Sequence, residues 1–407
     1  MSMYKFVQKD ILGIQENSFI VDLLLDAILI YLGISAFNKN TNHQKILSLL
    51  VIAFSILGFA YNSTDIITYL NGLRELLIIP AVILFLEAVK KSPLVLFFFK
   101  EVKRFIFFFL ALQIPCALYQ FSQYGASDKV GGSLGAYSSG ILTLTIFISL
   151  FFLTLFNSTF YTKSRFKALL PLTVFLLPVV LNETKITFII IPIFILCVIQ
   201  VKNFRSIISI SIGCLILIGA VSSLYSDGTK KINNPIKEIF NKDFLEKYLT
   251  NEVEKGEDVP RFTKIAFASK LISEDSGNFL LGMEYGAFKG GTFLKTSPFA
   301  QKYNWLLLGS RPYIFYLLIT GGLLLSLLIL YQINKVLYAQ FLNIKLNNFQ
   351  TLFLRFIIII IMLYNDAFRD RFFISIFFTI QILLTVLNWY EMRKIQYCQK
   401  IKVHLYE

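Results

Sequence analysis

The sequence predicts an all-α polytopic integral membrane protein with about eleven transmembrane helices (ten to twelve) and one long extracytoplasmic loop that contains short helices. Of its 407 residues, 56% are hydrophobic and only 16% are charged, which is typical of a membrane protein. Runs such as FIVDLLLDAILIYLGISAF and ILSLLVIAFSILGFAY approach the roughly 20 residues that cross about 30 Å of hydrocarbon. Because the bilayer interior offers no water to the backbone, such runs must be helical.

The apolar runs follow one another along the chain and divide it into three parts. Before residue 226 we expect eight spans, at about 19 to 37, 46 to 62, 66 to 88, 104 to 123, 138 to 157, 168 to 182, 185 to 201 and 205 to 225. After the long polar segment 226 to 311 we expect three more, at about 312 to 334, 350 to 366 and 372 to 391. Residues 1–225 and 312–407 are therefore membrane parts, the latter with a cytoplasmic tail, and 226–311 is the extracytoplasmic loop.

The basic residues set the expected orientation. They fall in short segments between apolar runs, at Lys39 and Lys45, at Lys90 to Arg104, at Lys163 to Lys167 and in the tail after Arg393. Loops rich in Lys and Arg stay in the cytoplasm, which places 226–311 and the N-terminus outside. The net charge of +14 is explained by these loops, so nucleic acid is not an expected partner. The mixed, polar N-terminal stretch lacks the pattern of a cleavable signal peptide.

Metal chemistry is not expected from this composition. The chain has four cysteines and two histidines. Cys116, Cys197 and Cys214 lie in apolar runs, and Cys398 lies in the tail. This pattern indicates neither a disulfide framework nor a zinc or iron site.

The long loop has the features of a segment with ordered structure. Its charges nearly balance, and loops of this length are usually functional. Two stretches, PIKEIFNKDFLEKYLTNEVEKG and FTKIAFASKLI, have the spacing of amphipathic helices. We expect them to lie along the membrane surface over a cavity. The alternative is that they only pack on the spans.

A glycine-punctuated stretch, GNFLLGMEYGAFKGG, follows these helices at residues 277 to 291. Glycine permits tight turns and a close approach of the backbone to a ligand. Backbone N–H groups of such a turn can meet phosphate or sugar oxygens. The alternative is that Gly282 and Gly286 only turn the chain back toward the bilayer.

The order of features in the loop resembles the O-antigen polymerase and ligase superfamily. Arg261 is followed by an apolar helical stretch, by NFLLGMEYGAF and by GSRPYIFYLLITGGLL, which leads into a span. The stretches GGSLGAYSSGILTL and LNETKITFIIIPIFIL are similar to the same superfamily. Where the ligase pattern has a histidine before the ninth span, this chain has Arg311. That departure favours a polymerase of the Wzy type over a ligase.

The resemblance implies a glycosyltransferase of the bacterial inner (cytoplasmic) membrane that needs neither cofactor nor metal. It would polymerise undecaprenyl-pyrophosphate-linked oligosaccharide repeats into O-antigen or capsular polysaccharide by transfer from the lipid carrier to a sugar hydroxyl. Its partners would be these lipid-linked oligosaccharides, the lipid bilayer and a separate chain-length regulator. The alternatives are an O-antigen ligase that delivers glycan to lipid A-core and a polysaccharide flippase or exporter.

The candidate site residues follow from the charge of pyrophosphate. A guanidinium stays ionised near lipid and offers a planar fork to phosphate oxygens, so Arg261 and then Arg311 are the expected catalytic cations, with Glu284 as the general base. The expected substrate-binding residues are Arg74, Lys185, Gly282, Tyr285, Gly286, Arg369 and Arg371. The structural alternatives are that Arg74 pairs with Asp65 or another helix, that Lys185 is a snorkelling anchor, and that the NDAFRDRFF segment pairs within itself.

Overall fold

A computed structural model describes residues 2–13, 19–63, 65–92, 95–160, 169–182, 184, 186–199, 261–286, 288, 297–307, 309, 311–342, 348–384 and 386. Within these residues the regular structure is helical throughout, with no strand, as the sequence predicts. The expected span at 205 to 225, the first amphipathic stretch of the long loop and Lys185 lie outside the described residues.

Helices occupy the positions of the predicted spans in the first half of the chain. After the short N-terminal elements α1 (Ser2–Phe6) and η1 (Val7–Ile11) come α2 (Phe19–Ala36), α3 (Asn42–Asn62), α4 (Ile66–Lys90), α5 (Val95–Tyr124) and α6 (Ser139–Phe160). The 3-10 helix η4 (Leu170–Leu176), α8 (Leu177–Leu181) and α9 (Thr187–Ile199) follow. The N-terminal helix α1 was not expected from the sequence.

The second half begins with short helices of the long loop. These are α13 (Arg261–Ser273), α14 (Ser276–Leu281), α15 (Pro298–Lys302) and η5 (Asn304–Leu307). Long helices α16 (Tyr313–Leu342) and α17 (Asn348–Tyr364) follow, and η6 (Ala367–Arg369) leads into a helix over Arg371–Leu384. Helix α13 confirms the helix predicted over FTKIAFASKLI.

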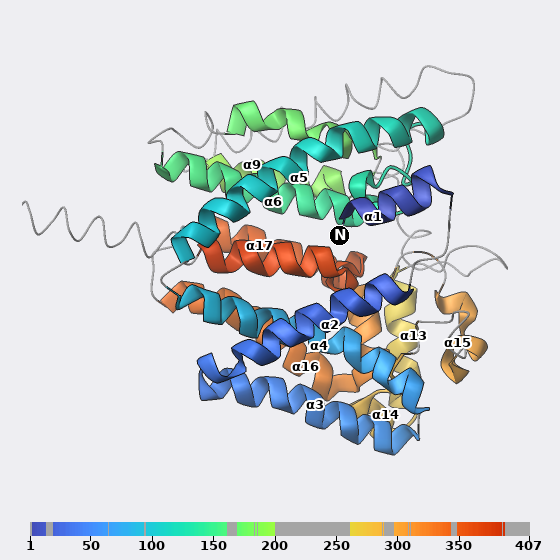
Figure 1. The fold of residues 1–407 in the computed structure, drawn as a ribbon. Helices are drawn as coiled ribbons and strands as arrows, with labels where there is room; N and C mark the ends of the chain where they lie inside the picture. The colour runs from blue at the N-terminus through green and yellow to red at the C-terminus, as the bar shows by residue number, and fades with distance from the viewer. Residues whose placement is uncertain are drawn as a thin grey trace, which may run out of the picture.

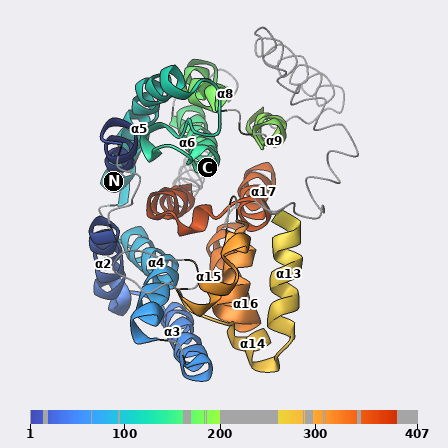
Figure 2. The same cartoon turned by 90° about the vertical axis from the view of Figure 1, so that its right-hand side faces the viewer.

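The long helices lie side by side, as Figure 1 shows from the side and Figure 2 from one end. Helices α2, α3, α4 and α16 form one group, and α5, α6, α8 and α9 form another, with α17 between them. Helix α13 crosses the direction of the long helices at the end of the bundle where α14 and α15 also lie. The helix predicted to lie along the membrane surface therefore runs across the bundle and contacts α16 and α17.

Five of the described helices are long and apolar enough to cross a bilayer: Val21–Lys39, Asn42–Asn62, Phe97–Tyr124, Ser139–Asn157 and Tyr313–Lys335. Four shorter apolar helices cover Leu170–Leu181, Thr187–Val198, Leu352–Tyr364 and Arg371–Leu384. The predicted span at 168 to 182 is divided into η4 and α8. Pro171 and Pro178 stand at the starts of these two pieces, and each removes a backbone donor and disfavours a continuous helix.

The core runs through α6. Both faces of helix α6 are covered by neighbouring segments, and Leu142, Phe147, Phe151 and Phe152 have no exposed surface. In contrast, α2, α3 and α5 leave large apolar side chains exposed, among them Leu24, Ile28, Leu49, Phe97 and Phe108. So much exposed apolar surface is unusual for a protein surrounded by water and matches faces that contact lipid.

The glycine turn fits against a break in α16. Gly322 interrupts that helix with non-helical angles (φ 60°, ψ −159°). The carbonyl of Ile319, one turn earlier, accepts a hydrogen bond from the Met283 N–H at 2.8 Å. A broken helix at membrane depth needs such a partner for its backbone groups. The turn therefore supplies a bond to the backbone of the broken span.

Close backbone contact explains the glycines of the turn. A Cβ on Gly282 (φ +82°) would lie 2.6 Å from the backbone of Thr320 and Gly321, and one on Gly286 (φ +79°) would lie 2.4 Å from the Thr68 carbonyl. A Cβ on Gly72 in α4 would lie 2.3 Å from the Gly286 nitrogen. At Gly282 and Gly286 the backbone thus approaches neighbouring helices, where the sequence predicts an approach to a ligand.

We expect Gly282→Ala to destabilise the protein more than Gly125→Ala. Both glycines have positive φ, but an alanine Cβ at Gly125 (φ +69°) meets nothing within 4 Å. Gly125→Ala costs only the left-handed strain of about 1–2 kcal/mol, whereas Gly282→Ala adds overpacking of about 1–3 kcal/mol. Unfolding by SDS titration in mixed micelles measures both variants, and equal losses would show that backbone contact with α16 is unimportant.

Candidate functional site

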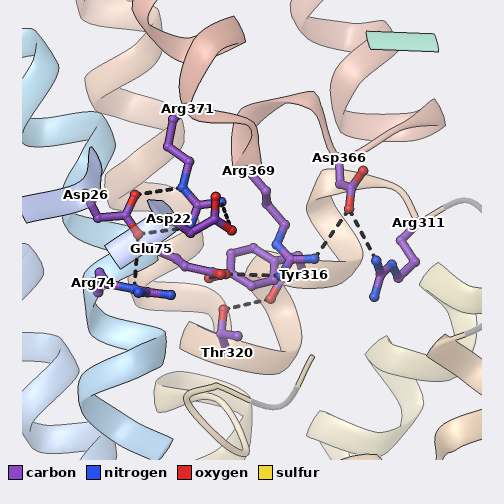
Figure 3. A network of polar contacts seen from close by, with 10 residues as sticks. All are labelled: Asp22, Asp26, Arg74, Glu75, Arg311, Tyr316, Thr320, Asp366, Arg369 and Arg371. Atoms are coloured by element: carbon purple, nitrogen blue, oxygen red, sulfur yellow. Dashed lines mark hydrogen bonds and ion pairs between the residues drawn. The ribbon is translucent and has the colours of Figure 1, made fainter. Parts of the chain in front are cut away.

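Ion pairs join segments far apart in the sequence at one end of the bundle (Figure 3). Four arginines and four carboxylates take part: Arg74, Arg311, Arg369 and Arg371 with Asp22, Asp26, Glu75 and Asp366. They come from α2, α4, the start of α16 and the turn between α17 and the last described helix. The sequence predicts the outer side of the membrane for this end.

Asp26 is the centre of the inner part of the network. Its carboxylate accepts two hydrogen bonds from Arg371, at 2.7 Å from Nε and 2.9 Å from Nη2. Arg74 Nε lies 3.1 Å from the same carboxylate, and Asp26 has no exposed surface. Asp22, one helical turn earlier on α2, lies 3.5 Å from Arg371. Arg74 therefore pairs with another helix, and Asp65 instead caps the N-terminus of α4.

Arg369 connects Glu75 of α4 with Asp366, in the turn that follows α17. Its Nη2 donates to Glu75 Oε2 at 3.1 Å, and its Nη1 lies 3.4 Å from Asp366. Tyr316 on α16 donates to the same Glu75 oxygen at 3.4 Å, and the guanidinium lies 4.6 Å from the Tyr316 ring centroid. Burial opposes the charge of Arg369, but the Glu75 and Asp366 carboxylates raise its pKa. Arg369 is therefore a fixed cation.

Arg311 approaches Arg369 through a shared carboxylate. Its Nη2 lies 3.8 Å from Asp366. Both guanidiniums lie near the ring of Phe288, at 5.9 Å for Arg311 and 5.5 Å for Arg369. Burial and the nearby Arg369 lower the pKa of Arg311. In the part of the chain that the structure describes, the Nε atoms of both arginines lack a hydrogen-bond partner.

The N-terminal helix α1 contacts the turn that contains Arg369 and Asp370. Lys5 of α1 pairs with Asp370 at 2.5 Å. The other Asp370 oxygen accepts a hydrogen bond from the Phe373 N–H and so caps the following helix. Burial opposes ionisation of Asp370, but Lys5 lowers its pKa overall. The segment NDAFRDRFF was predicted to bind substrate or to pair within itself, and its charges reach α1, α2, α4 and Arg311 instead of pairing only with one another.

Arg261 lies next to this network but makes different contacts. It is the first residue of α13, and its Nε donates to the Tyr364 carbonyl at 2.9 Å. The guanidinium also covers the Tyr364 ring at 3.9 Å from the centroid. Tyr364 ends α17, so the cation lies at a helix C-terminus, which it stabilises. The described contacts of Arg261 are those of an anchor for α13.

Glu284 and Tyr285 are placed by packing. The Glu284 carboxylate accepts a hydrogen bond from the Phe299 N–H at 2.9 Å, near the start of α15, and burial raises its pKa. Tyr285 is fully buried, with its ring 5.5 Å from Tyr69 in an edge-to-face arrangement. Since Glu284 is only 8% exposed, the expected general base has little open surface.

The structure therefore brings some predicted residues together and separates others. Arg311 and Arg369 meet on Asp366, and Arg74 and Arg371 meet on Asp26. Gly282, Tyr285, Gly286 and Glu284 lie in the turn packed on α3, α4 and α16. Lys185 lies outside the described residues.

Sequence reasoning missed three participants: Asp22, Asp26 and Lys5. The sequence could have indicated the two aspartates, which stand four residues apart inside an apolar span. Carboxylates there are energetically unfavourable unless they have partners. Nothing in the sequence indicates a role for Lys5, since a single lysine in a polar N-terminal stretch is common.

The arrangement is suited to binding an anion between two helical ends. Guanidiniums form charge-assisted bonds to phosphate, and in the described ranges the buried Nε atoms of Arg311 and Arg369 have no hydrogen-bond partner. Asp366 and Arg311 have 27% and 25% of their side chains exposed and Arg369 has 13%, so solvent reaches mainly the Arg311 side of the pair. The chain matches no protein-family model, no curated protein and no solved structure.

Proposed function

We propose that this protein is a multi-pass membrane glycosyltransferase of the Wzy type, which polymerises undecaprenyl-pyrophosphate-linked oligosaccharide repeats at the outer face of the bacterial inner membrane. The observation that carries the proposal is the convergence of Arg311 and Arg369 on Asp366 at one end of a bundle of apolar helices. The order of motifs in the long loop supports the same class.

In the proposed reaction, a hydroxyl of the acceptor sugar attacks the anomeric carbon of the donor glycan. The new glycosidic C–O bond forms as the bond between that carbon and the pyrophosphate oxygen breaks. Undecaprenyl pyrophosphate leaves with the electron pair, and the hydroxyl proton passes to a carboxylate. Pyrophosphate is a good leaving group, so the main tasks of the protein are to align the two substrates and to neutralise the developing charge.

The contacts refine the roles assigned to residues. Arg369 and Arg311 are the proposed pyrophosphate cations, since they share Asp366 and each has a buried Nε with no hydrogen-bond partner among the described residues. Asp366 replaces Glu284 as the proposed proton acceptor because it lies between those arginines and has 27% of its side chain exposed. Arg74 and Arg371, both held by Asp26, are proposed to fix the helices around the site. Arg261 is proposed to position α13 over it.

Deleting the gene in its native host and profiling lipid-linked and surface glycans by gel and mass spectrometry tests this function. We expect single repeat units at the surface, because export and ligation continue without polymerisation. Long lipid-linked chains that never reach their acceptor would instead identify a ligase. Single units retained on the cytoplasmic face would identify a flippase and contradict the proposal.

A further inference from the structure

A small cavity lies between α3, α4 and α16 near the Lys335 end of α16, among the basic segments that the sequence places in the cytoplasm. Its volume is about 40 Å³, and Glu87, Gln332 and Lys335 contribute polar groups to its wall. Leu47 and Ile83 are part of its apolar lining. None of these residues belongs to the arginine network.

Among the described residues, Gln332 presents unpartnered polar atoms to the cavity. It is only 5% exposed, and within the described part of the chain neither its amide nitrogen nor its amide oxygen has a hydrogen-bond partner. Leaving buried donors and acceptors unsatisfied costs about 1–3 kcal/mol for each group. A ligand that supplies both an acceptor and a donor to the amide removes this free-energy cost.

Glu87 indicates the charge of that ligand. The residue is 8% exposed, and among the described residues its ion-pair partner is Lys90, one turn later, at 3.9 Å. The Lys335 ammonium also acts electrostatically on Glu87, and a cation in direct hydrogen-bond contact would balance this buried carboxylate further. Lys335, on the facing helix α16, supplies positive charge to the same cavity. The wall therefore presents a carboxylate, an amide and an ammonium, which matches a ligand with both a cation and an anion.

We propose that this cavity binds the headgroup of phosphatidylethanolamine, with its primary ammonium held by Glu87 and Gln332 and its phosphate near Lys335. A primary ammonium can donate hydrogen bonds to the Glu87 carboxylate and the Gln332 amide oxygen, whereas the trimethylammonium of choline has no N–H to donate. Apolar lining and a position at the ends of spanning helices favour a lipid over a free small molecule. Pockets between transmembrane helices are known to bind lipid headgroups.

Native mass spectrometry of the full-length protein tests the proposal without any assay of glycan transfer. The purified protein is equilibrated with an equimolar mixture of phosphatidylethanolamine, phosphatidylcholine and phosphatidylglycerol that carry identical acyl chains. We expect phosphatidylethanolamine to be retained about tenfold over the other two lipids, since a hydrogen bond to a charged group contributes about 1.5–3 kcal/mol. Gln332→Leu and Glu87→Gln should each remove that preference.

Glu101→Gln is the matched control, because Glu101 on α5 is exposed and pairs locally with Arg104 at 2.7 Å. It should keep the wild-type preference. Gln332→Leu removes an unsatisfied amide, so this variant should fold at least as well as wild type in lipid-free detergent. Equal retention of phosphatidylcholine, an unchanged preference in both cavity variants, or retention of added free phosphoethanolamine instead of the lipid would overturn the proposal.

Discussion

Arg369→Ala is expected to lower the rate of repeat-unit polymerisation by about 10²–10³, the effect of removing a preorganised donor to a developing anion. Arg369 is fixed by Glu75 and Asp366, and its buried Nε has no hydrogen-bond partner in the part of the chain that the structure describes. Arg369→Lys should not restore the rate, because an ammonium lacks the planar fork that meets two phosphate oxygens. The measurement is the initial rate of chain growth by purified protein in lipid bilayers with synthetic lipid-linked repeats.

Two controls separate catalysis from folding in this experiment. Arg369→Ala leaves Glu75 buried without its cation, so the variant Glu75→Gln with Arg369→Gln supplies a neutral, polar pair at the same place. We expect this double variant to recover thermal stability but not the rate. Arg104→Ala removes an exposed arginine and should leave the rate unchanged. A full rate in Arg369→Ala at normal abundance would remove Arg369 from the proposed mechanism.

Asp26→Ala is expected to lower the free energy of unfolding by about 3–5 kcal/mol, the cost of removing one partner of a buried ion pair. Asp26 has no exposed surface and holds both Arg371 and Arg74. Its loss leaves two guanidiniums in a buried environment with a much weaker counter-charge. SDS-induced unfolding of the purified protein measures the change.

Asp22→Ala is the internal comparison for Asp26→Ala. Asp22 lies on the same helix and contacts the same Arg371, but at 3.5 Å and with 18% of its side chain exposed. Partly exposed pairs contribute about 1 kcal/mol or less, so Asp22→Ala should be the milder change. Equal effects of the two variants would mean that the tight contacts of Asp26 add nothing to stability.

The local pattern of apolar residues predicts much of the fold. Helices α2, α3, α4, α6 and α9 lie where hydropathy places them, because a bilayer leaves a long apolar run few alternatives to a helix. The amphipathic spacing of FTKIAFASKLI likewise predicts α13. The division of the 168 to 182 segment into η4 and α8 could have been anticipated from Pro171 and Pro178.

The sequence predicts only part of the candidate site. Arg311 and Arg369 stand out because arginines next to apolar spans are functional candidates. Arg261 stands out equally, yet its guanidinium covers Tyr364. Glu284 stands out by its position between glycines, and its carboxylate accepts a backbone hydrogen bond near the start of α15. Sequence spacing does not reveal which of these side chains point toward one another.

The sequence by itself determined the helical, membrane-type architecture and the kinds of charged residue available to a site, since both follow from local composition. Only the tertiary structure decided that Arg371 pairs with Asp26, 345 positions away in the sequence, and that Gly282 lies against Gly321 of α16. The physical reason is that hydropathy acts on each segment separately. Partner choice depends on the relative rotation and depth of helices, which are fixed only when all of them pack together.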